Sequence, residues 1–288
     1  MRLVSGGMTT SLGPGVRRRV LGKRLRKLRE KRGMTTTTVS KRMKMAQPSL
    51  SRIENGRNAI LTEHVYKLCE IYGASKAETT RLIRLSEQSR ERGWWESYSD
   101  VISDWFEIYA SLESDAERIL LYESEFVPGM FQTPGYIRAV YRAAHPEAGD
   151  EAANRAVDLR VARQLRLEDR SITALINEGA VRRVVGGSSV MLDQVRHLID
   201  VIERQHADIR IMPFAAGAHA AMSGPFNLLK FPDANEIDLV YVENERGGMY
   251  FERPEDLARY TDIFDRALGL ALAPEESVAL LGKIGEEY

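Results

Sequence analysis

The sequence predicts a multidomain chain of α and α/β class: an all-α N-terminal domain of five helices, a helical segment, and a C-terminal α/β domain with a small sheet. Three observations support this fold class. Apolar residues recur at helical spacing through the first 93 residues. After about residue 170, short apolar runs alternate with helical segments, which is typical of an α/β domain. With 288 residues, of which 43% are hydrophobic, the chain can form about two cores.

Four segments follow from composition and spacing. Residues 1–15 are rich in Gly, Ser and Thr, so we expect a flexible arm there. Residues 16–75 form the first domain, and 76–93 form its last helix and the helical connector to the rest of the chain. Residues 94–288 form the larger C-terminal domain.

The first helix of the N-terminal domain is predicted over 21–29. Leu21, Leu25 and Leu28 lie at i, i+4 and i+7, so they share one face that must pack inward. Lys and Arg occupy the other faces. Gly33 ends this helix at its C′ position, where a left-handed backbone is needed.

Two further helices follow at short intervals. Thr35 or Thr36 offers a hydroxyl group to cap the second helix, over 34–43. A tight turn at 44–46 leads into a third helix that begins at Gln47. Helices over 62–72 and 76–92 complete the bundle.

The C-terminal domain is predicted to stay helical from Trp94 to about residue 169 and then to change period. Strands are expected at 172–177, 208–213, 226–231 and 238–243. Helices are expected at 190–205, 254–272 and 275–286. This alternation predicts a small, mainly buried sheet.

Charge is distributed very unevenly along a chain that is neutral overall. Residues 1–58 contain 16 Lys and Arg and only two acids, Glu30 and Glu54, whereas residues 59–288 contain 25 bases and 39 acids. A basic patch on one module is typical of DNA binding, because neutralising phosphates releases counterions. The alternative is an ordinary solvated helix face. Because the basic segment coincides with the three closely spaced helices, we favour DNA binding.

The third helix supplies the residues expected to contact DNA bases. Leu50 and Ile53, three apart, point inward and leave the N-terminal end and outer face exposed. Gln47 can pair with an adenine edge, and Arg52 can pair with a guanine or hold a phosphate. Arg57 is placed for a phosphate. The candidate DNA-binding residues are Thr36, Thr37, Gln47, Pro48, Ser49, Ser51, Arg52, Asn55 and Arg57.

The order and spacing of these helices resemble the Xre family, which includes the phage lambda, Cro and 434 repressors. The resemblance implies a lambda-repressor-like helix-turn-helix domain that binds double-stranded DNA, and it implies that Glu54 pairs with an Arg of the first helix. Two features depart from the family pattern. Ala46 replaces the usual Ser or Thr cap of the recognition helix, and threonines at 35–38 replace a Gln- and Glu-rich start of the second helix. Specificity therefore cannot be transferred from a relative.

Stretches of the C-terminal domain resemble the WhiJ-like, antitoxin-like transcriptional regulators of filamentous actinobacteria. The matching stretches are 125–134, 160–164, 211–219 and 239–243. The resemblance implies a regulator of development or specialised metabolism, and a small, genetically linked partner protein arranged as in a toxin–antitoxin pair. We expect a homodimer on an inverted repeat, with 94–288 as the regulatory and dimerisation domain. The alternative is an antitoxin or adaptor that chiefly sequesters a small partner and autoregulates its operon.

The sequence offers little for chemistry, so we expect a protein that is not an enzyme and needs no cofactor or metal. His197 and His206 lie nine apart, off the spacing of a helical metal pair, and Cys69 lies on the apolar side of a helix. His219, in a loop of Gly and Ala, is the one histidine that suggests a site, although loop packing is the simpler interpretation. A third hypothesis, a degenerate phospholipase D-like hydrolase, lacks the His-x-Lys pair that such enzymes need.

Targeting features point to a cytoplasmic protein. The sequence contains no apolar run near the ~20 residues that span a bilayer, so we expect no membrane association. The first residues also lack the basic region and apolar core of a signal peptide.

Overall fold

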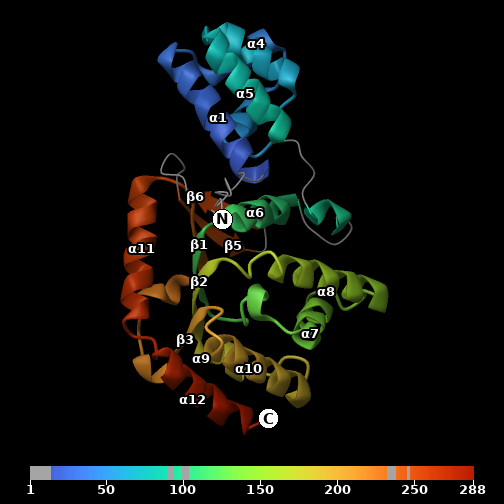
Figure 1. Ribbon diagram of the computed structural model, residues 1–288, viewed down its shortest axis with the longest axis vertical. Helices are drawn as coiled ribbons and strands as arrows, with labels where there is room; N and C mark the ends of the chain where they lie inside the picture. The colour runs from blue at the N-terminus through green and yellow to red at the C-terminus, as the bar shows by residue number, and fades with distance from the viewer. Residues whose placement is uncertain (1–13, 90–93, 99–103, 232–237, 245–246) are drawn as a thin grey trace, which may run out of the picture. The chain divides into compact units, whose positions relative to one another are not determined.

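The computed structural model describes residues 14–89, 94–98, 104–231, 238–244 and 247–288 (Figure 1). The chain divides into two compact units, residues 1–96 and 97–288. Within the described residues, no helix has the length and apolar character needed to cross a membrane.

The first unit is a bundle of five helices. They are α1 (Pro14–Lys31), α2 (Thr36–Met43), α3 (Gln47–Glu54), α4 (Thr62–Tyr72) and α5 (Lys76–Gln88). The predicted stripe is confirmed, because Leu21 and Leu25 are fully buried and Leu28 packs against the same core. Helix α1 begins at Pro14, and residues 1–13 of the expected arm lie outside the described part.

Helix α5 is an integral part of this bundle. Leu82 is fully buried in the core that α1 to α4 share. The Ser86 hydroxyl donates a hydrogen bond to the Ile60 carbonyl oxygen at 2.9 Å, which ties α5 to the loop before α4. Most of the segment 76–93 therefore packs within the first unit, while 90–93 lie outside the described residues.

Helices α1 and α3 cross at a glycine. A Cβ atom added to Gly22 would lie 2.4 Å from the Ile53 carbonyl oxygen and 2.7 Å from that of Glu54. Real Cβ atoms do not approach backbone this closely, so only glycine allows the two helices to come this near. The crossing holds the C-terminal end of α3 against α1.

The second unit is built on a six-stranded mixed sheet with the order β3-β2-β1-β4-β5-β6. The strands are β1 (Arg118–Glu123), β2 (Ser171–Asn177), β3 (Asp208–Met212), β4 (Phe226–Lys230), β5 (Leu239–Asn244) and β6 (Gly247–Phe251). Strands β1, β2 and β3 are parallel, and β4, β5 and β6 extend the sheet in antiparallel pairs.

Helices cover both faces of the sheet. Helix α11 lies on one face, and α6, α7, α8 and α10 lie on the other (Figure 1). The helices are α6 (Asp104–Asp115), α7 (Pro134–Ala144), α8 (Asp150–Gln164), α9 (Glu178–Arg182), α10 (Ser188–Glu203), α11 (Pro254–Leu268) and α12 (Pro274–Gly285). Short 3-10 turns are η1 (Trp94–Tyr98), η2 (Gly129–Phe131), η3 (Phe214–Ala216) and η4 (Ala220–Ser223). On the α11 face, Phe264 and Ala267 pack against Leu120, Leu228 and Val240.

The predicted fold class is confirmed, as are the four predicted strands, which are β2 to β5. The prediction that the chain stays helical to about residue 169 is wrong, because β1 lies at the centre of the sheet. Its residues 119–122 form a continuous apolar run that is buried on both faces. Such a run lacks the alternation of a half-exposed strand and cannot be told from a helix by period.

Strand β6 was also not predicted. It begins Gly247-Gly248, and glycine is unfavourable in strands. A Cβ atom on Gly248 would lie 2.3 Å from the Tyr241 ring. The strand therefore depends on packing against its neighbour β5, which local sequence does not reveal.

Gly22→Ala should lower the free energy of unfolding of the first unit by about 1–3 kcal/mol, since the added methyl group separates α1 from α3. The measurement is native-state hydrogen exchange of α1 and α3 amides in the full chain. Gly282→Ala in α12, measured by exchange of the α12 amides, is the matched control, because nothing lies within 4 Å of its added Cβ atom. That control should be neutral or stabilising. Equal behaviour of the two variants would contradict the steric account.

Candidate nucleic-acid interface

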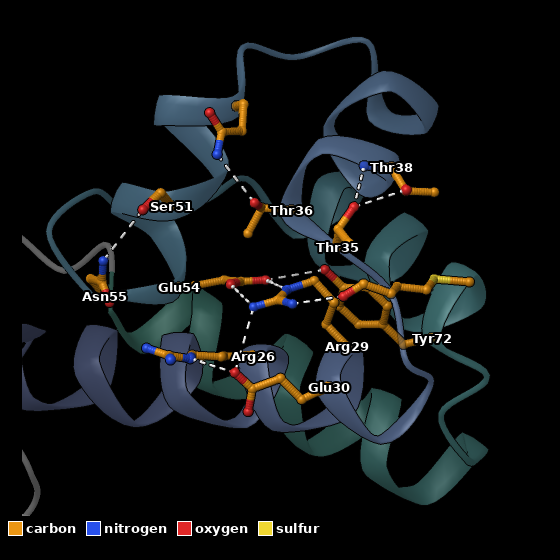
Figure 2. A network of polar contacts seen from close by, with 12 residues as sticks. Arg26, Arg29, Glu30, Thr35, Thr36, Thr38, Ser51, Glu54, Asn55 and Tyr72 are labelled. Atoms are coloured by element: carbon orange, nitrogen blue, oxygen red, sulfur yellow. Dashed lines mark hydrogen bonds and ion pairs between the residues drawn. The ribbon is translucent and has the colours of Figure 1, made fainter.

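A buried ion pair joins α1 to α3. The Arg29 Nε and Nη2 atoms donate to Glu54 Oε1 and Oε2 at 2.7 and 2.9 Å, and Arg29 Nη1 donates to the Met34 carbonyl oxygen at 2.7 Å. The Tyr72 hydroxyl of α4 donates to Glu54 Oε1 at 3.4 Å. Figure 2 shows these groups converging between the helices. The expected pairing of Glu54 with an Arg of the first helix is confirmed.

Burial and the neighbouring charges both shift the pKa values of residues in this cluster. The hydrogen bonds to Glu54 raise the pKa of Arg29 above its usual value. Burial raises the pKa of Tyr72, and the nearby Glu54 carboxylate adds to that effect. Both shifts keep the cluster as a charged pair with a neutral hydroxyl, and this state fixes the inner end of α3.

The outer face of α3 is open. Leu50 and Ile53 are buried as predicted, whereas Gln47, Pro48 and Arg52 are exposed. Ser49 and Ser51 are half-buried. The expected recognition face is therefore assembled at the surface of the first unit.

The start of α3 has no side-chain cap. Ala46 is the N-cap residue and makes no side-chain hydrogen bond, as the departure from the family pattern predicts. The first amide groups of a helix lack intrahelical partners, and Pro48 lacks an amide proton altogether. The Ser49 amide at this end donates to the Ala46 carbonyl oxygen at 3.0 Å, so of these first amides that of Gln47 remains for an anion such as a DNA phosphate.

The structure brings two of the predicted contact residues together across the turn. Gln47 Nε2 donates to Thr36 Oγ1 at 3.2 Å. Of the two predicted capping candidates, Thr35 caps α2 by accepting from the Thr38 amide at 3.1 Å, so Thr36 is left to hold Gln47 (Figure 2). Thr37, on the same turn of α2, is exposed.

The end of α3 carries the other predicted residues. Asn55 Nδ2 donates to Ser51 Oγ at 3.5 Å (Figure 2). Asn55 and Arg57 are both exposed, and the Arg57 amide donates to the Arg52 carbonyl oxygen at 2.8 Å. Gly56, with φ of 68°, provides the left-handed turn between them.

Three exposed basic residues that the sequence pattern did not single out border this face. Lys41 and Arg42 lie in the last turn of α2, and Lys44 lies in the turn before α3. Lys44 adopts φ of 53°, a left-handed conformation that is uncommon for residues other than glycine. Their positive charge could have identified them in the sequence, because a helix-turn-helix domain uses basic residues at such positions to bind phosphates.

The remaining titratable candidates do not assemble a site. The described residues contain no group of three or more His, Cys, Asp and Glu that could hold a metal ion. Cys69 is buried as predicted, and burial raises the pKa of its thiol. His219 packs edge-on against Tyr122, with ring centroids 5.5 Å apart, and burial lowers its pKa.

Each unit matches the model of a known protein family. Residues 106–283 match the family described as a domain of unknown function (DUF5753), and residues 20–82 match a helix-turn-helix domain. The first match spans more than half of the chain. The chain belongs to the DUF5753 family. Neither the curated proteins nor the solved structures contain a match to it. The helix-turn-helix match, with the exposed face of α3 and the basic residues that border it, indicates a DNA-binding regulator.

Glu54→Gln should destabilise the first unit by about 3–5 kcal/mol, because it leaves the Arg29 guanidinium buried without its carboxylate. Hydrogen exchange of the α1 and α3 amides in the full chain measures this free energy. Glu70→Gln provides the control, since Glu70 is exposed on α4 and a surface substitution should change the free energy of unfolding by less than about 0.5 kcal/mol. A loss at Glu54 no larger than that at Glu70 would refute the assigned role.

Proposed function

We propose that this DUF5753 protein is a sequence-specific transcriptional regulator that binds an inverted repeat in double-stranded DNA as a homodimer. The observation that carries the proposal is the outer face of α3. It presents Gln47 and Arg52 to solvent while its inner face is anchored by the buried Arg29–Glu54 pair. A rigid helix with exposed polar residues at its N-terminal end suits the major groove.

The side chains of this face have distinct proposed roles. Gln47 pairs with an adenine edge, and the Thr36 bond orients its amide so that the carbonyl oxygen and one amide proton remain free. Arg52 pairs with a guanine. Thr37, Ser49, Ser51 and Asn55 contact the groove wall and backbone, and Pro48 packs against a base or sugar.

Phosphate contacts position the domain on the duplex. Arg57 holds a phosphate beyond the end of α3, and Lys41 and Lys44 hold phosphates on the α2 side. The excess of 16 basic residues over two acids in 1–58 supports this sequence-independent part of the affinity. The second unit, residues 97–288, contains 33 acids and 19 bases, so it repels phosphate and leaves DNA contact to the first unit.

The second unit is proposed to dimerise the chain and to receive a signal from a small ligand or a small, genetically linked partner protein. Its resemblance to the WhiJ-like, antitoxin-like regulators supports this role. A signal changes DNA affinity only if it binds two states of the dimer with different affinities. Because such coupling is reciprocal, operator DNA must change the affinity for the signal by the same factor.

Gln47→Ala and Arg52→Ala should each cost about 1–3 kcal/mol of specific binding while leaving random-sequence affinity nearly unchanged. Arg57→Ala should weaken specific and random DNA alike and reduce the salt slope by about 1. The measurement is a titration of selected operator and random duplexes at several salt concentrations. An unchanged operator-to-random ratio for Arg52→Ala would show that Arg52 contacts a phosphate instead.

Footprinting of the full chain on selected DNA should protect two inverted half-sites with centres about 34 Å apart, one helical turn of DNA. This spacing follows from two-fold symmetry of a dimer with one recognition helix in each major groove. Protection of a single half-site at every protein concentration would contradict the dimer. A genome-wide binding map with sites only at the protein's own operon would favour the antitoxin alternative.

A further inference from the structure

The two ends of the six-stranded sheet differ. At one end, β3 is bridged by the chain that follows α11. The Ile211 amide donates to Ser277 Oγ at 3.0 Å, and the Ile211 carbonyl oxygen accepts from the Leu272 amide at 3.0 Å. At the other end, β6 pairs with β5 alone among the described strands. One edge of β6 therefore faces no strand of this chain within the described residues.

Strand β6 lacks the features with which proteins usually protect an edge strand. Its residues, Gly247–Phe251, include no charged residue and no proline. Its pairing with β5 runs without a bulge from Asn244–Gly247 to Val240–Phe251. An edge strand directs part of its backbone N–H and C=O groups outward, where they can pair with another strand. An apolar edge of this kind is typical of a site to which a further strand is added.

The apolar layers on both faces of the sheet end at β6 with side chains that are still partly exposed. On the α11 face, Phe251 packs against Tyr260 with ring centroids 5.9 Å apart, while Met249 is 46% exposed. On the α6 face, the ring of Tyr250 lies 5.2 Å from that of Tyr241, and Tyr250 is half-buried. A strand placed beside β6 would therefore bury apolar surface on both faces of the sheet.

The sequence of β6 is complementary to itself when one copy is reversed about Met249. Antiparallel pairing on a two-fold axis sets Met249 opposite Met249 of the second copy, Gly248 opposite Tyr250, and Gly247 opposite Phe251. Each aromatic side chain then lies beside a glycine, which has no side chain to obstruct the ring and whose backbone the ring shields from water. The strand therefore suits a second copy of itself.

The order of charges in the sequence on either side of β6 fits the same register. The dipeptide Glu-Arg occurs at 245–246 and again at 252–253. When one copy is reversed about Met249, position 252 corresponds to 246 and position 253 to 245, so each glutamate corresponds to an arginine. Opposite charges across a strand pair are favourable, and like charges are unfavourable. Reversal about Tyr250 instead sets 247 against 253 and 248 against 252, so both matches are lost.

We propose that β6 is the surface through which two copies of this chain associate, as an antiparallel strand pair centred on Met249. The two sheets then join into one continuous sheet. Because the two-fold axis is perpendicular to the sheet, both α11 helices lie on one face of it and both α6 helices on the other. This inference rests on the homodimer of the proposed function, for which it supplies the dimerising surface.

The experiment measures the dissociation constant of the dimer by analytical ultracentrifugation of the full chain without DNA. The wild-type chain should form a dimer of twice its 32.5 kDa mass. Met249→Lys and Met249→Glu should each raise the dissociation constant at least about tenfold, because each sets two like charges directly opposite one another. An equimolar mixture of the two variants should lower it again by a similar factor, since a lysine then faces a glutamate.

Met222→Lys is the matched control, because this methionine is 65% exposed in η4, outside β6, and its replacement should leave the dissociation constant unchanged. Recovery of the dimer in the mixture also excludes misfolding of the single variants. A wild-type chain that stays monomeric would contradict both the homodimer and this surface. A dimer that persists in Met249→Lys, or a mixture that does not recover it, overturns β6 as the surface and leaves the DNA-binding proposal standing.

Discussion

The buried pair of Arg29 and Glu54 is the interaction on which the DNA-binding unit depends. It lies where α1, α3 and the loop before α2 meet, and the Tyr72 hydroxyl adds α4 to the same point. A buried charge that lost its partner would cost several kcal/mol, so the pair admits one arrangement of these helices. Gly22 acts at the same crossing by allowing backbone-to-backbone approach. Together they determine which face of α3 is presented to solvent.

In the second unit, side-chain hydrogen bonds join two segments that lie far apart in the sequence. Its two most distinctive stretches, 125–134 and 160–164, contact each other through side-chain amides and guanidinium groups. Gln164 Nε2 donates to the carbonyl oxygens of Gly129 and Gln132, and Arg160 donates to Gln132. These bonds hold α8 against the η2 turn.

Much of the first unit could be predicted because its signals are local. The stripe of Leu21 and Leu25, the left-handed Gly33 and the Thr35 cap each act within one or two helical turns. The strands β2 to β5 were predicted for a similar reason, since short runs of β-branched and apolar residues between turn signals mark them. Strand β1 was missed because full burial removes the alternation that identifies a strand.

The sequence by itself determined the helices of the first unit, the basic character of that unit and the residues of the α3 face, because each depends on neighbours along the chain. Tertiary structure alone decided which side chains from different helices and strands contact one another. It placed Thr36 against Gln47, Gly248 against the ring of Tyr241, and Arg163 against Glu113. These are long-range contacts, fixed by the packing of helices and the register of strands, and no periodicity within a segment encodes them.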